Sequence, residues 1–560
     1  MHLRDMLRLL AAGLALTVAL GAQTQTPTPA PTPPPSPRPA NAPRLLVVLI
    51  LDQFRADYIE MYGRQWTKGL RRLVDQGAVF TQAAYPYAAT YTCAGHATIA
   101  TGAYPAVHGM AGNDFYDRTL RRLVPCAFDP AVTSVPFGGG PGKERHSGRN
   151  LLIPSFPEEL RRQTSTPTRI VSIAQKPRSS ITFAGRGHAD TVAVFEEDDG
   201  TWATSDAFTP APWPDVDEFV RAHPIKAAYG AIWQLLLPAS AYRFADNAPG
   251  ESRVAPSTQV FPHPINSTKG VPDNEFVTAW EKSPLDDEFL TNLAIHLLKS
   301  RRLGTGTSTD VLTLSLPSLD HNGHDYGPRS HEVQDILARA DVNIGRLIDA
   351  IDEQVGPRYT IGFSSDHGVA LLPEQATADG LDAGRISTTE IRNAVDAALE
   401  KFLGTPRPHV AAVYDSQVAL VPGLNDILRQ RPNGFKTVKD AILSVKGLAA
   451  VYSADEIVHG ADSTDARIKA WRLSYVAGRS GDFVMTPKPN WILRTVSGST
   501  HGTLNPYDQR VPLIFFGMRI KPGKYDAPAS PADLAPTLME LAGAKLPRAQ
   551  GRPLTDAIVR

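Results

Sequence analysis

The chain has 560 residues, of which 42% are hydrophobic and 20% are charged, a composition typical of a folded globular protein. Lys+Arg and Asp+Glu both number 57, so there is no basic surplus to indicate a nucleic-acid partner. The length suits one large α/β domain with insertions, or two or three smaller domains.

Residues 1–22 are predicted to be a signal peptide. Arg4 and Arg8 precede an apolar run over residues 9–20, and Gly21-Ala22 supplies small residues for cleavage. The run is shorter than the roughly 20 residues that span a bilayer, and Gln23 stands where a lipoprotein signal would need Cys. We therefore expect a periplasmic or secreted protein without a membrane anchor.

Residues 23–43 are rich in Pro and Thr and have no apolar periodicity, which predicts an extended, disordered linker. The predicted catalytic domain, residues 44–560, begins with LLVVLILD, a continuous apolar run typical of a parallel strand buried on both faces. Further runs of this kind are RIVSIAQ, DVLTLSLP, YTIGFSSD and VPLIFFG, and helical patterns such as Trp66–Gln76 and Glu332–Gln354 separate them. This alternation predicts an α/β fold with a doubly wound, mostly parallel central sheet flanked by helices. Residues about 190–285 and 375–490 interrupt the pattern and are interpreted as insertions that form a cap.

In the segment TYTCAGHATIATG, a polar turn that carries the hydroxyls of Thr90 and Thr92 is predicted to open a short helix of small residues that ends in Thr-Gly. The N-terminus of a helix offers free N–H groups and a positive dipole end to an anion, so a hydroxyl there is a candidate nucleophile for a phosphoryl group. Thr is also an ordinary N-cap residue, and this segment alone leaves both interpretations open. Cys93 and Cys126, the only cysteines, are either one disulfide or two buried thiols.

Acidic and imidazole side chains follow several of the predicted strands. Active sites of open α/β sheets lie at the carboxyl ends of the strands, so we expect these side chains to converge. Asp and His ligands without Cys suit zinc in an open catalytic site, although an Asp can simply cap a helix and a His can be structural. The candidate ligands are Asp52, Asp320, His324 (with His321 as its competitor), Asp366, His367 and His501.

Lys176-Pro177-Arg178 follows the strand RIVSIAQ. In an extended backbone the two cations would project to the same side and could hold phosphate oxygens. Asn113 follows the Thr92 helix by one loop, and its amide could donate to the same group. The alternatives are a solvated basic turn for the cations and a Gly-Asn turn for Asn113.

Taken together, these segments resemble the alkaline phosphatase superfamily, and within it the PafA-type alkaline phosphatases, which are monoesterases with a threonine nucleophile. The matching landmarks run in the family order from Asp52 to His501, and the resemblance covers essentially everything after the linker. One departure is Ala94, since relatives commonly read T-x-P-G-H where this chain reads Thr92-Cys93-Ala94-Gly95-His96. The change removes a proline suited to the first helical turn but no reacting group.

The resemblance implies two Zn²⁺ per chain, small-molecule phosphate monoesters as substrates and a phosphothreonine intermediate; it leaves the oligomeric state open. Thr92 would be the nucleophile and a metal ligand, with Thr90 as the alternative nucleophile. Asp52, Asp366 and His367 would hold one zinc, and Asp320, His324 and His501 the other. Asn113, Lys176 and Arg178 would bind the phosphoryl oxygens, the Lys and Arg taking the place of a third, magnesium site.

Three rival functions remain at this stage. A nucleotide pyrophosphatase or phosphodiesterase would share both metals and the threonine, but the two cations beside Asn113 favour a dianionic monoester. A sulfatase is disfavoured because Cys93 lacks the C-x-P-x-R context for conversion to formylglycine. A metal-stabilised binding protein without catalysis is the alternative from a different class.

Overall fold

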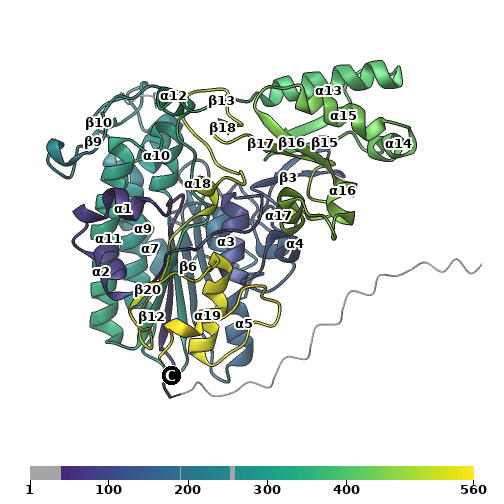
Figure 1. Cartoon of the computed structure of the whole chain (residues 1–560). Helices are drawn as coiled ribbons and strands as arrows, with labels where there is room; N and C mark the ends of the chain where they lie inside the picture. The colour runs from purple at the N-terminus through teal and green to yellow at the C-terminus, as the bar shows by residue number, and fades with distance from the viewer. Residues whose placement is uncertain (1–39, 189–190, 253–258, 560) are drawn as a thin grey trace, which may run out of the picture. The chain divides into compact units, whose positions relative to one another are not determined.

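A computed structural model describes residues 40–188, 191–252 and 259–559 (Figure 1). The predicted signal peptide and most of the predicted linker lie outside these ranges. Among the described residues, the largest sheet has ten strands in the spatial order β20-β2-β19-β12-β1-β11-β6-β7-β8-β5. Their bounds are β1 (Leu45–Leu51), β2 (Ala78–Phe80), β5 (Ser134–Pro136), β6 (Ile170–Ala174), β7 (Thr191–Glu196), β8 (Trp202–Ser205), β11 (Asp310–Leu316), β12 (Tyr359–Ser364), β19 (Leu513–Gly517) and β20 (Gly523–Tyr525).

The middle of this sheet is parallel. β12, β1, β11, β6 and β7 are neighbours that run in one direction, and Leu49 of β1 pairs with Leu314 of β11 and with Phe363 of β12. β19 and β8 join the parallel part in antiparallel pairings. The predicted α/β fold with a mostly parallel central sheet is therefore confirmed.

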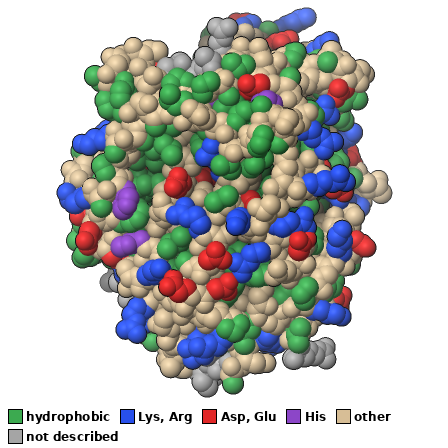
Figure 2. Space-filling model, turned by 90° about the vertical axis from the view of Figure 1, so that its left-hand side faces the viewer, with side chains coloured by type: hydrophobic (Ala, Val, Ile, Leu, Met, Phe, Trp, Pro, Cys, Tyr) green, Lys and Arg blue, Asp and Glu red, His purple; other side chains and the backbone are tan. Residues whose placement is uncertain are grey.

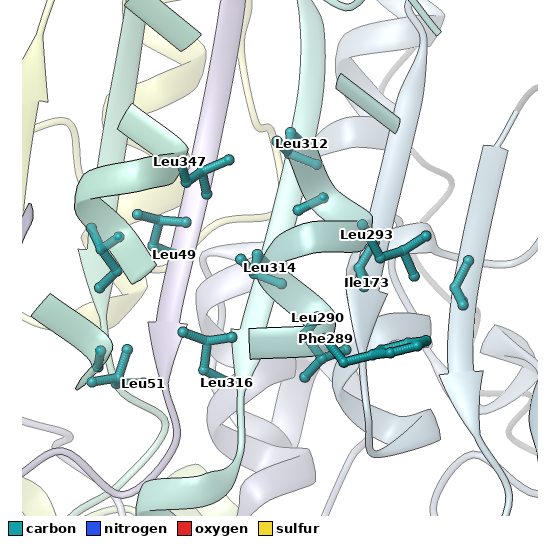
Figure 3. Close-up of a cluster of buried hydrophobic side chains, with 14 of the residues drawn as sticks. Leu49, Leu51, Ile173, Phe289, Leu290, Leu293, Leu312, Leu314, Leu316 and Leu347 are labelled. Carbon is teal, nitrogen blue, oxygen red and sulfur yellow. The ribbon is translucent and has the colours of Figure 1, made fainter. Parts of the chain in front are cut away.

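Helices cover both faces of the sheet because successive strand residues point to opposite sides. Leu49 and Leu51 of β1 share one core with residues of α9 and α11, as Figure 3 shows. Leu46, Val48 and Ile50 share a second core with residues of α3, α5 and α19. The bounds of these helices are α3 (Thr92–Thr101), α5 (Phe156–Gln163), α9 (Pro284–Ser300), α11 (His331–Val355) and α19 (Leu534–Ala542). Each fully buried Leu contributes roughly 1.5–3 kcal/mol, so β1 is anchored from both sides.

A second sheet lies within the predicted second insertion. Its four strands have the order β14-β15-β17-β16 and pair antiparallel around a core of their own. Its elements are α13 (Thr388–Leu403), β14 (Val410–Tyr414), β15 (Gln417–Leu420), α14 (Leu424–Gln430), α15 (Gly434–Leu443), β16 (Leu448–Ser453), α16 (Ala454–His459), α17 (Ala466–Ser474) and β17 (Phe483–Pro487). β7 and β8, near the start of the predicted first insertion, belong to the central sheet. The insertion boundaries themselves stay predictions.

The described chain also has further short helices and strands besides its 3₁₀ turns. They are α1 (Tyr58–Tyr62), α2 (Gly69–Gln76), α4 (Pro105–His108), β3 (Asp114–Asp117), β4 (Arg122–Pro125), α6 (Pro177–Ala184), α7 (Pro214–Ala222), β9 (Ala231–Trp233), β10 (His263–Ile265), α8 (Asn274–Glu281), α10 (Ser318–Tyr326), α12 (Pro373–Ala378), β13 (Gly384–Arg385), β18 (Trp491–Ile492) and α18 (Pro506–Gln509).

The surface carries both signs of charge. Figure 2 shows Lys and Arg side chains interspersed with Asp and Glu on the face that it displays, in keeping with the equal numbers of the two kinds. Within the described ranges, every helix is too short or too polar to traverse a bilayer.

Candidate metal and phosphoryl site

Four adjacent strands of the central sheet, β12, β1, β11 and β6, send polar side chains to one edge. The segments that follow them carry Asp366 with His367, then Asp52, Asp320 and Lys176. All five side chains are buried, with exposed fractions between 0% and 8%. The parallel register thus brings together groups that lie more than 300 residues apart in the sequence.

The first ligand group consists of Asp52, Asp366 and His367, whose ligand atoms all lie within 4.8 Å of one another. His367 Nε2 is 3.5 Å from Asp52 Oδ1 and 3.3 Å from Asp366 Oδ2. Both of those carboxylate oxygens are buried and have no hydrogen-bond partner within the described chain. Thr92 Oγ1 lies 3.3 Å from the same Nε2 atom, so the predicted nucleophile faces this group.

The second ligand group surrounds Asp320. Asp320, His367 and His501 also have ligand atoms within 4.8 Å of one another, and His324 Nε2 lies 3.3 Å from Asp320 Oδ1. Asp320 and His324 stand one turn apart on α10, on the same face of the helix. His321 points elsewhere, with its Nε2 atom 3.3 Å from Gln175 Oε1, so the geometry favours His324 over its competitor.

Three histidines of the site share one hydrogen-bonding arrangement. The Nδ1–H groups of His324, His367 and His501 donate to the backbone carbonyls of Ser499, Gly368 and Thr90, at 2.9, 3.0 and 2.8 Å. A carbonyl oxygen can only accept, so in a neutral imidazole the lone pair is on Nε2, and the Nε2 atoms of His324, His367 and His501 lie 3.3, 3.3 and 3.9 Å from the nearest carboxylate oxygens. Such outward N–H bonds are typical of histidines that bind metals. Lone pairs facing carboxylate oxygens repel unless a cation lies between them.

Helix α3 begins at Thr92 and ends, as predicted, at the Thr-Gly pair, where Gly102 adopts the left-handed conformation. Tyr91 is the N-cap residue and makes no side-chain capping bond, so Thr92 Oγ1 is not an N-cap acceptor. Thr90 Oγ1 donates to the carbonyl of Thr503 and is thereby engaged away from the ligand groups. Gly95 lets α3 approach Asp366, because a Cβ at residue 95 would lie 2.2 Å from the Asp366 carbonyl oxygen.

The conformation expected for Lys176-Pro177-Arg178 was wrong. Helix α6 begins at Pro177, so Lys176 is the N-cap residue and Arg178 lies in the first turn. Proline favours the first helical position, where its missing N–H costs nothing, and this preference overrides the extended pattern. Lys176 Nζ contacts Asp52 Oδ2 at 2.7 Å and Asp320 Oδ2 at 2.5 Å, which places the ammonium between the two ligand groups.

Arg178 is half-buried and makes no hydrogen bond or ion pair with any residue that the structure describes. Its Nε atom is buried without a partner. Its positive charge lowers the pKa of Asp114, Asp198 and Asp415, although burial raises the pKa of each of these groups more strongly. The guanidinium is therefore available to an anion.

Asn113 and the disulfide lie at the start of α3. Cys93 and Cys126 form the disulfide, which resolves the alternative left open by the sequence. Asn113 Oδ1 accepts from Cys93 N at 2.9 Å, and Cys126 N donates to the Asn113 carbonyl at 2.8 Å. One hydrogen bond from each half-cystine therefore fixes Asn113 beside the residue that follows Thr92.

Electrostatics in this pocket are dominated by burial. Burial, together with Asp320 and Asp366, raises the pKa of Asp52 well above its ordinary value, against the opposing effect of Lys176. Burial also disfavours charge on Asp320, but Lys176 and His324 outweigh it and hold the pKa of Asp320 well below its usual range. Burial lowers the pKa of both His367 and His501, which keeps their imidazoles neutral, as metal binding requires.

Two site residues were missed by sequence reasoning. Gln53 donates from its backbone N–H to Asp366 Oδ1 at 3.1 Å and from Nε2 to Asp320 Oδ1 at 2.6 Å. His96 Nδ1 lies 2.9 Å from the Thr92 carbonyl and 3.3 Å from Asp366 Oδ2. The sequence could have indicated His96, because it stands one helical turn after Thr92. For Gln53, the only indication in the sequence was its position next to Asp52.

The donors fit a pair of divalent ions. The buried carboxylate oxygens without partners and the inward-facing Nε2 lone pairs together provide mixed oxygen and nitrogen ligands, which zinc accepts. The structure groups His367 with both carboxylate clusters, whereas the sequence interpretation assigned it to the Asp52 group alone. Two buried sites of this kind are consistent with a bimetallic alkaline phosphatase.

Comparisons with known proteins agree with this geometry. The family model described as Type I phosphodiesterase / nucleotide pyrophosphatase matches residues 46–508. The chain therefore belongs to this family. Venom phosphodiesterase 2 of Crotalus adamanteus is 34% identical, but over 98 residues that make up 17% of this chain.

Longer matches connect the chain to alkaline phosphatases. Alkaline phosphatase PafA of Elizabethkingia meningoseptica is 29% identical over 532 residues, which cover 92% of this chain and 95% of that protein. A Myroides odoratus protein named calcium-transporting ATPase matches with the same identity and coverage. The crystal structure of wild-type alkaline phosphatase PafA matches with a TM-score of 0.84 at 28% identity, covering 92% of this chain and 99% of that one. The predicted membership of the alkaline phosphatase superfamily, with its likeness to PafA-type enzymes, is confirmed.

Proposed function

We propose that the protein is an exported phosphatase that hydrolyses small-molecule phosphate monoesters at a di-zinc site through a phosphothreonine on Thr92. It is a phosphoric monoester hydrolase by its near full-length similarity to alkaline phosphatases. The observation that carries the proposal is the set of three Nε2 lone pairs directed at buried carboxylates, with Thr92 Oγ1 3.3 Å from one of them.

The chemistry is a double displacement at phosphorus. Thr92 Oγ forms a bond to phosphorus while the bond to the alcohol oxygen breaks; the hydroxyl proton is lost and the alcohol gains one. Water then attacks the phosphothreonine, releasing inorganic phosphate and restoring the hydroxyl. When bound, two zinc ions would lower the pKa of the Thr92 hydroxyl and of water and would stabilise the departing oxygen.

Asp52, Asp366 and His367, the group that Thr92 Oγ1 faces, would hold one ion, and Asp320, His324 and His501 would hold the other. His96 supports the first group, since its Nδ1–H donates to the Thr92 carbonyl and the same Nδ1 atom lies 3.3 Å from Asp366 Oδ2. That contact fixes the first turn of α3 against the ligand group. Thr92 itself would be a further ligand.

Phosphoryl oxygens would be held by three groups around Thr92. Arg178 offers an unpaired planar guanidinium, which suits bidentate binding of phosphate oxygens. Asn113 is fixed beside Cys93 at the N-terminus of α3, where free N–H groups favour an anion. Lys176 lies between Asp52 and Asp320, where a third cation would otherwise be required, in keeping with its expected replacement of magnesium. Because charge on the equatorial oxygens grows in the transition state, these cations favour the reaction.

A phosphodiesterase or nucleotide pyrophosphatase activity is the second candidate, and the family match favours it. A diester has one fewer negative charge and one more substituent. Two cations directed at one phosphoryl group therefore suit a monoester better, and the long alkaline phosphatase matches point the same way. A non-catalytic metal-binding protein would have no use for Thr92 or for the unpaired Arg178.

The disulfide indicates an extracytoplasmic location, since such bonds persist in oxidising compartments. A periplasmic or secreted enzyme that carries its signal peptide in residues 1–22 and a linker in residues 23–43 would meet this condition.

The deciding experiment compares p-nitrophenyl phosphate with bis(p-nitrophenyl) phosphate, with metal analysis of the same sample. We expect two zinc ions per chain and a far larger kcat/KM for the monoester. A preference for the diester would reject the monoesterase and favour the second candidate. Absence of both activities in the metal-loaded protein would favour a binding role.

The double substitution Lys176→Ala/Arg178→Ala sharpens this comparison. If the two cations bind a dianionic phosphoryl group, monoester turnover falls much more than diester turnover. Equal losses would remove their proposed role.

A further inference from the structure

A pocket of about 470 Å³ lies beside the site, and the proposed reaction does not use it. Its wall includes Arg122, Cys126, Phe128, Arg145 and Arg178. This volume is within the range of sites that bind small organic molecules.

Two residues of this pocket wall connect it to the proposed reacting groups. Arg178, which would hold phosphoryl oxygens, forms part of its wall. Cys126, also in the wall, is bonded to Cys93, the residue directly after Thr92. An ester whose phosphoryl group is held at Thr92 and Arg178 would therefore have this pocket next to it, and its alcohol part can extend there.

The wall carries more positive than negative charge. Four cationic side chains contribute to it against two carboxylates. Lys143 pairs with Asp199, and Glu144 Oε2 contacts His146 Nε2, whereas the second wall carboxylate, Asp198, has no ion pair within the described ranges. Arg178, Arg122 and Arg145 have no carboxylate within ion-pair distance anywhere in the described ranges.

The two outer arginines differ in how they are held. Arg122 stacks its guanidinium over the ring of Phe128, at 5.3 Å from the ring centroid. A stacked guanidinium keeps its N–H edge available to a ligand while the aromatic ring limits its movement. Arg145 donates one hydrogen bond, from Nη1 to the Pro130 carbonyl at 3.3 Å, and is otherwise exposed. Pro125 and Ala127 add apolar wall between the charges.

We propose, building on the phosphatase function above, that this pocket is a subsite for the alcohol part of the ester and selects phosphate monoesters that carry a second oxyanion. A neutral alcohol gains little from Arg122 and Arg145. A carboxylate or a second phosphate gains charge-assisted hydrogen bonds from both. The subsite therefore acts on substrate choice, while Thr92 and Arg178 act on the phosphoryl group common to all substrates.

The test uses two matched substrate pairs and the double variant Arg122→Gln/Arg145→Gln of the zinc-loaded full chain. One pair is phenyl phosphate and 4-carboxyphenyl phosphate; the other is 3-hydroxypropyl phosphate and propane-1,3-diyl bisphosphate. Comparing each substrate between wild type and variant cancels differences in leaving-group acidity. The control is Arg431→Gln/Arg548→Gln, which removes two exposed arginines outside the pocket.

We expect kcat/KM for the substrate with a second oxyanion to fall about fivefold more than for its neutral partner, mainly through KM, because each exposed ion pair contributes up to about 1 kcal/mol. The effect should shrink with added salt, and the control should show none. If the larger fall in kcat/KM is seen in the aryl pair, the subsite binds a carboxylate. If it is seen in the alkyl pair, the subsite binds a phosphate.

Equal losses within both pairs, or losses matched by the control variant, would overturn the subsite. A wild-type enzyme that hydrolyses phenyl phosphate but shows no such difference rejects the subsite alone. Failure to hydrolyse any of the four substrates rejects the phosphatase function as well.

Discussion

The proposed metal ligands and the proposed phosphate-binding residues come from different parts of the molecule. Asp52, Asp320 and Asp366 follow adjacent parallel strands and are almost fully buried, so the register of the sheet sets their spacing. Asn113 and Arg178 come from a loop and a helix start outside that register, and both are half-buried. The sheet thus fixes the proposed metal ligands, whereas two hydrogen bonds from the half-cystines fix Asn113, one of the proposed phosphate-binding residues.

The largest effect is expected at the point where the two parts meet. Thr92→Ala removes the proposed nucleophile, and kcat should fall by about 10⁴-fold or more. Acid-quenched samples incubated with a ³²P-labelled monoester should contain no phosphoenzyme.

Thr90→Val is the matched control, because Thr90 Oγ1 donates to the Thr503 carbonyl. It should retain the phosphoenzyme. Phosphoenzyme persisting in Thr92→Ala and missing from Thr90→Val would assign the nucleophile to Thr90.

The proposed metal ligands at the edge of the sheet are tested by the substitution Asp366→Asn. Loss of a carboxylate that lies 3.3 Å from His367 Nε2 should reduce bound zinc from two ions to one and lower kcat by about 10³-fold. Elemental analysis and turnover of one sample give both values. Asp349→Asn, on the surface, is the control; two zinc ions retained in Asp366→Asn would exclude this carboxylate as a ligand.

The proposed phosphate-binding part is tested by Arg178→Ala, in the first turn of α6. The substitution removes an unpaired guanidinium that is proposed to bind the phosphoryl oxygens. It should lower kcat/KM for the monoester by about 10²-fold without loss of zinc. Arg431→Ala serves as the exposed control. A loss of metal in Arg178→Ala would mean that this residue supports the ligand groups instead.

The disulfide variant Cys93→Ser/Cys126→Ser should separate stability from chemistry. The bond closes a loop across 33 residues, and its removal should lower the free energy of unfolding by about 3 kcal/mol. With Asn113 less firmly held, KM should rise a few-fold while kcat changes little. Urea unfolding and steady-state kinetics measure the two effects; an unchanged KM would show that the hydrogen bonds hold Asn113 without the disulfide.

A smaller, pH-dependent effect is expected at His108, which links the nucleophile helix to the Asn113 loop. It contacts Thr98 Oγ1 through Nε2 and accepts from Met110 N at Nδ1, each at 3.1 Å. Burial lowers its pKa from 6.5 to about 3. Because the unfolded chain binds the proton more readily, the stability contributed by neutral His108 is present above pH 6.5 and is lost as the pH falls toward 3.

At pH 5 this loss should amount to about 2 kcal/mol relative to pH 7.5. His108→Gln should therefore show a difference in unfolding free energy between the two pH values that is smaller by that amount. Equal pH dependence of wild type and variant, measured by urea unfolding, would contradict the assignment.

Sequence patterns predicted the sheet because the strands are buried on both faces and therefore read as continuous apolar runs. They also predicted that residues after these strands would converge, since parallel strands end at a common edge. They did not predict the helix start at Pro177, because an extended proline and an N1 proline have similar φ. Gln53 was also missed: its role depends on a left-handed backbone with φ of 69°, which only the packed loop imposes.

Because the bond between Cys93 and Cys126 forms only under oxidising conditions, the hold on Asn113 depends on the compartment in which the chain folds. A newly made chain in a reducing cytoplasm would lack this crosslink, and Asn113 would then be held beside Thr92 by hydrogen bonds alone. In an exported phosphatase of the kind proposed, the KM of the newly made chain would therefore be a few-fold higher before translocation than after it.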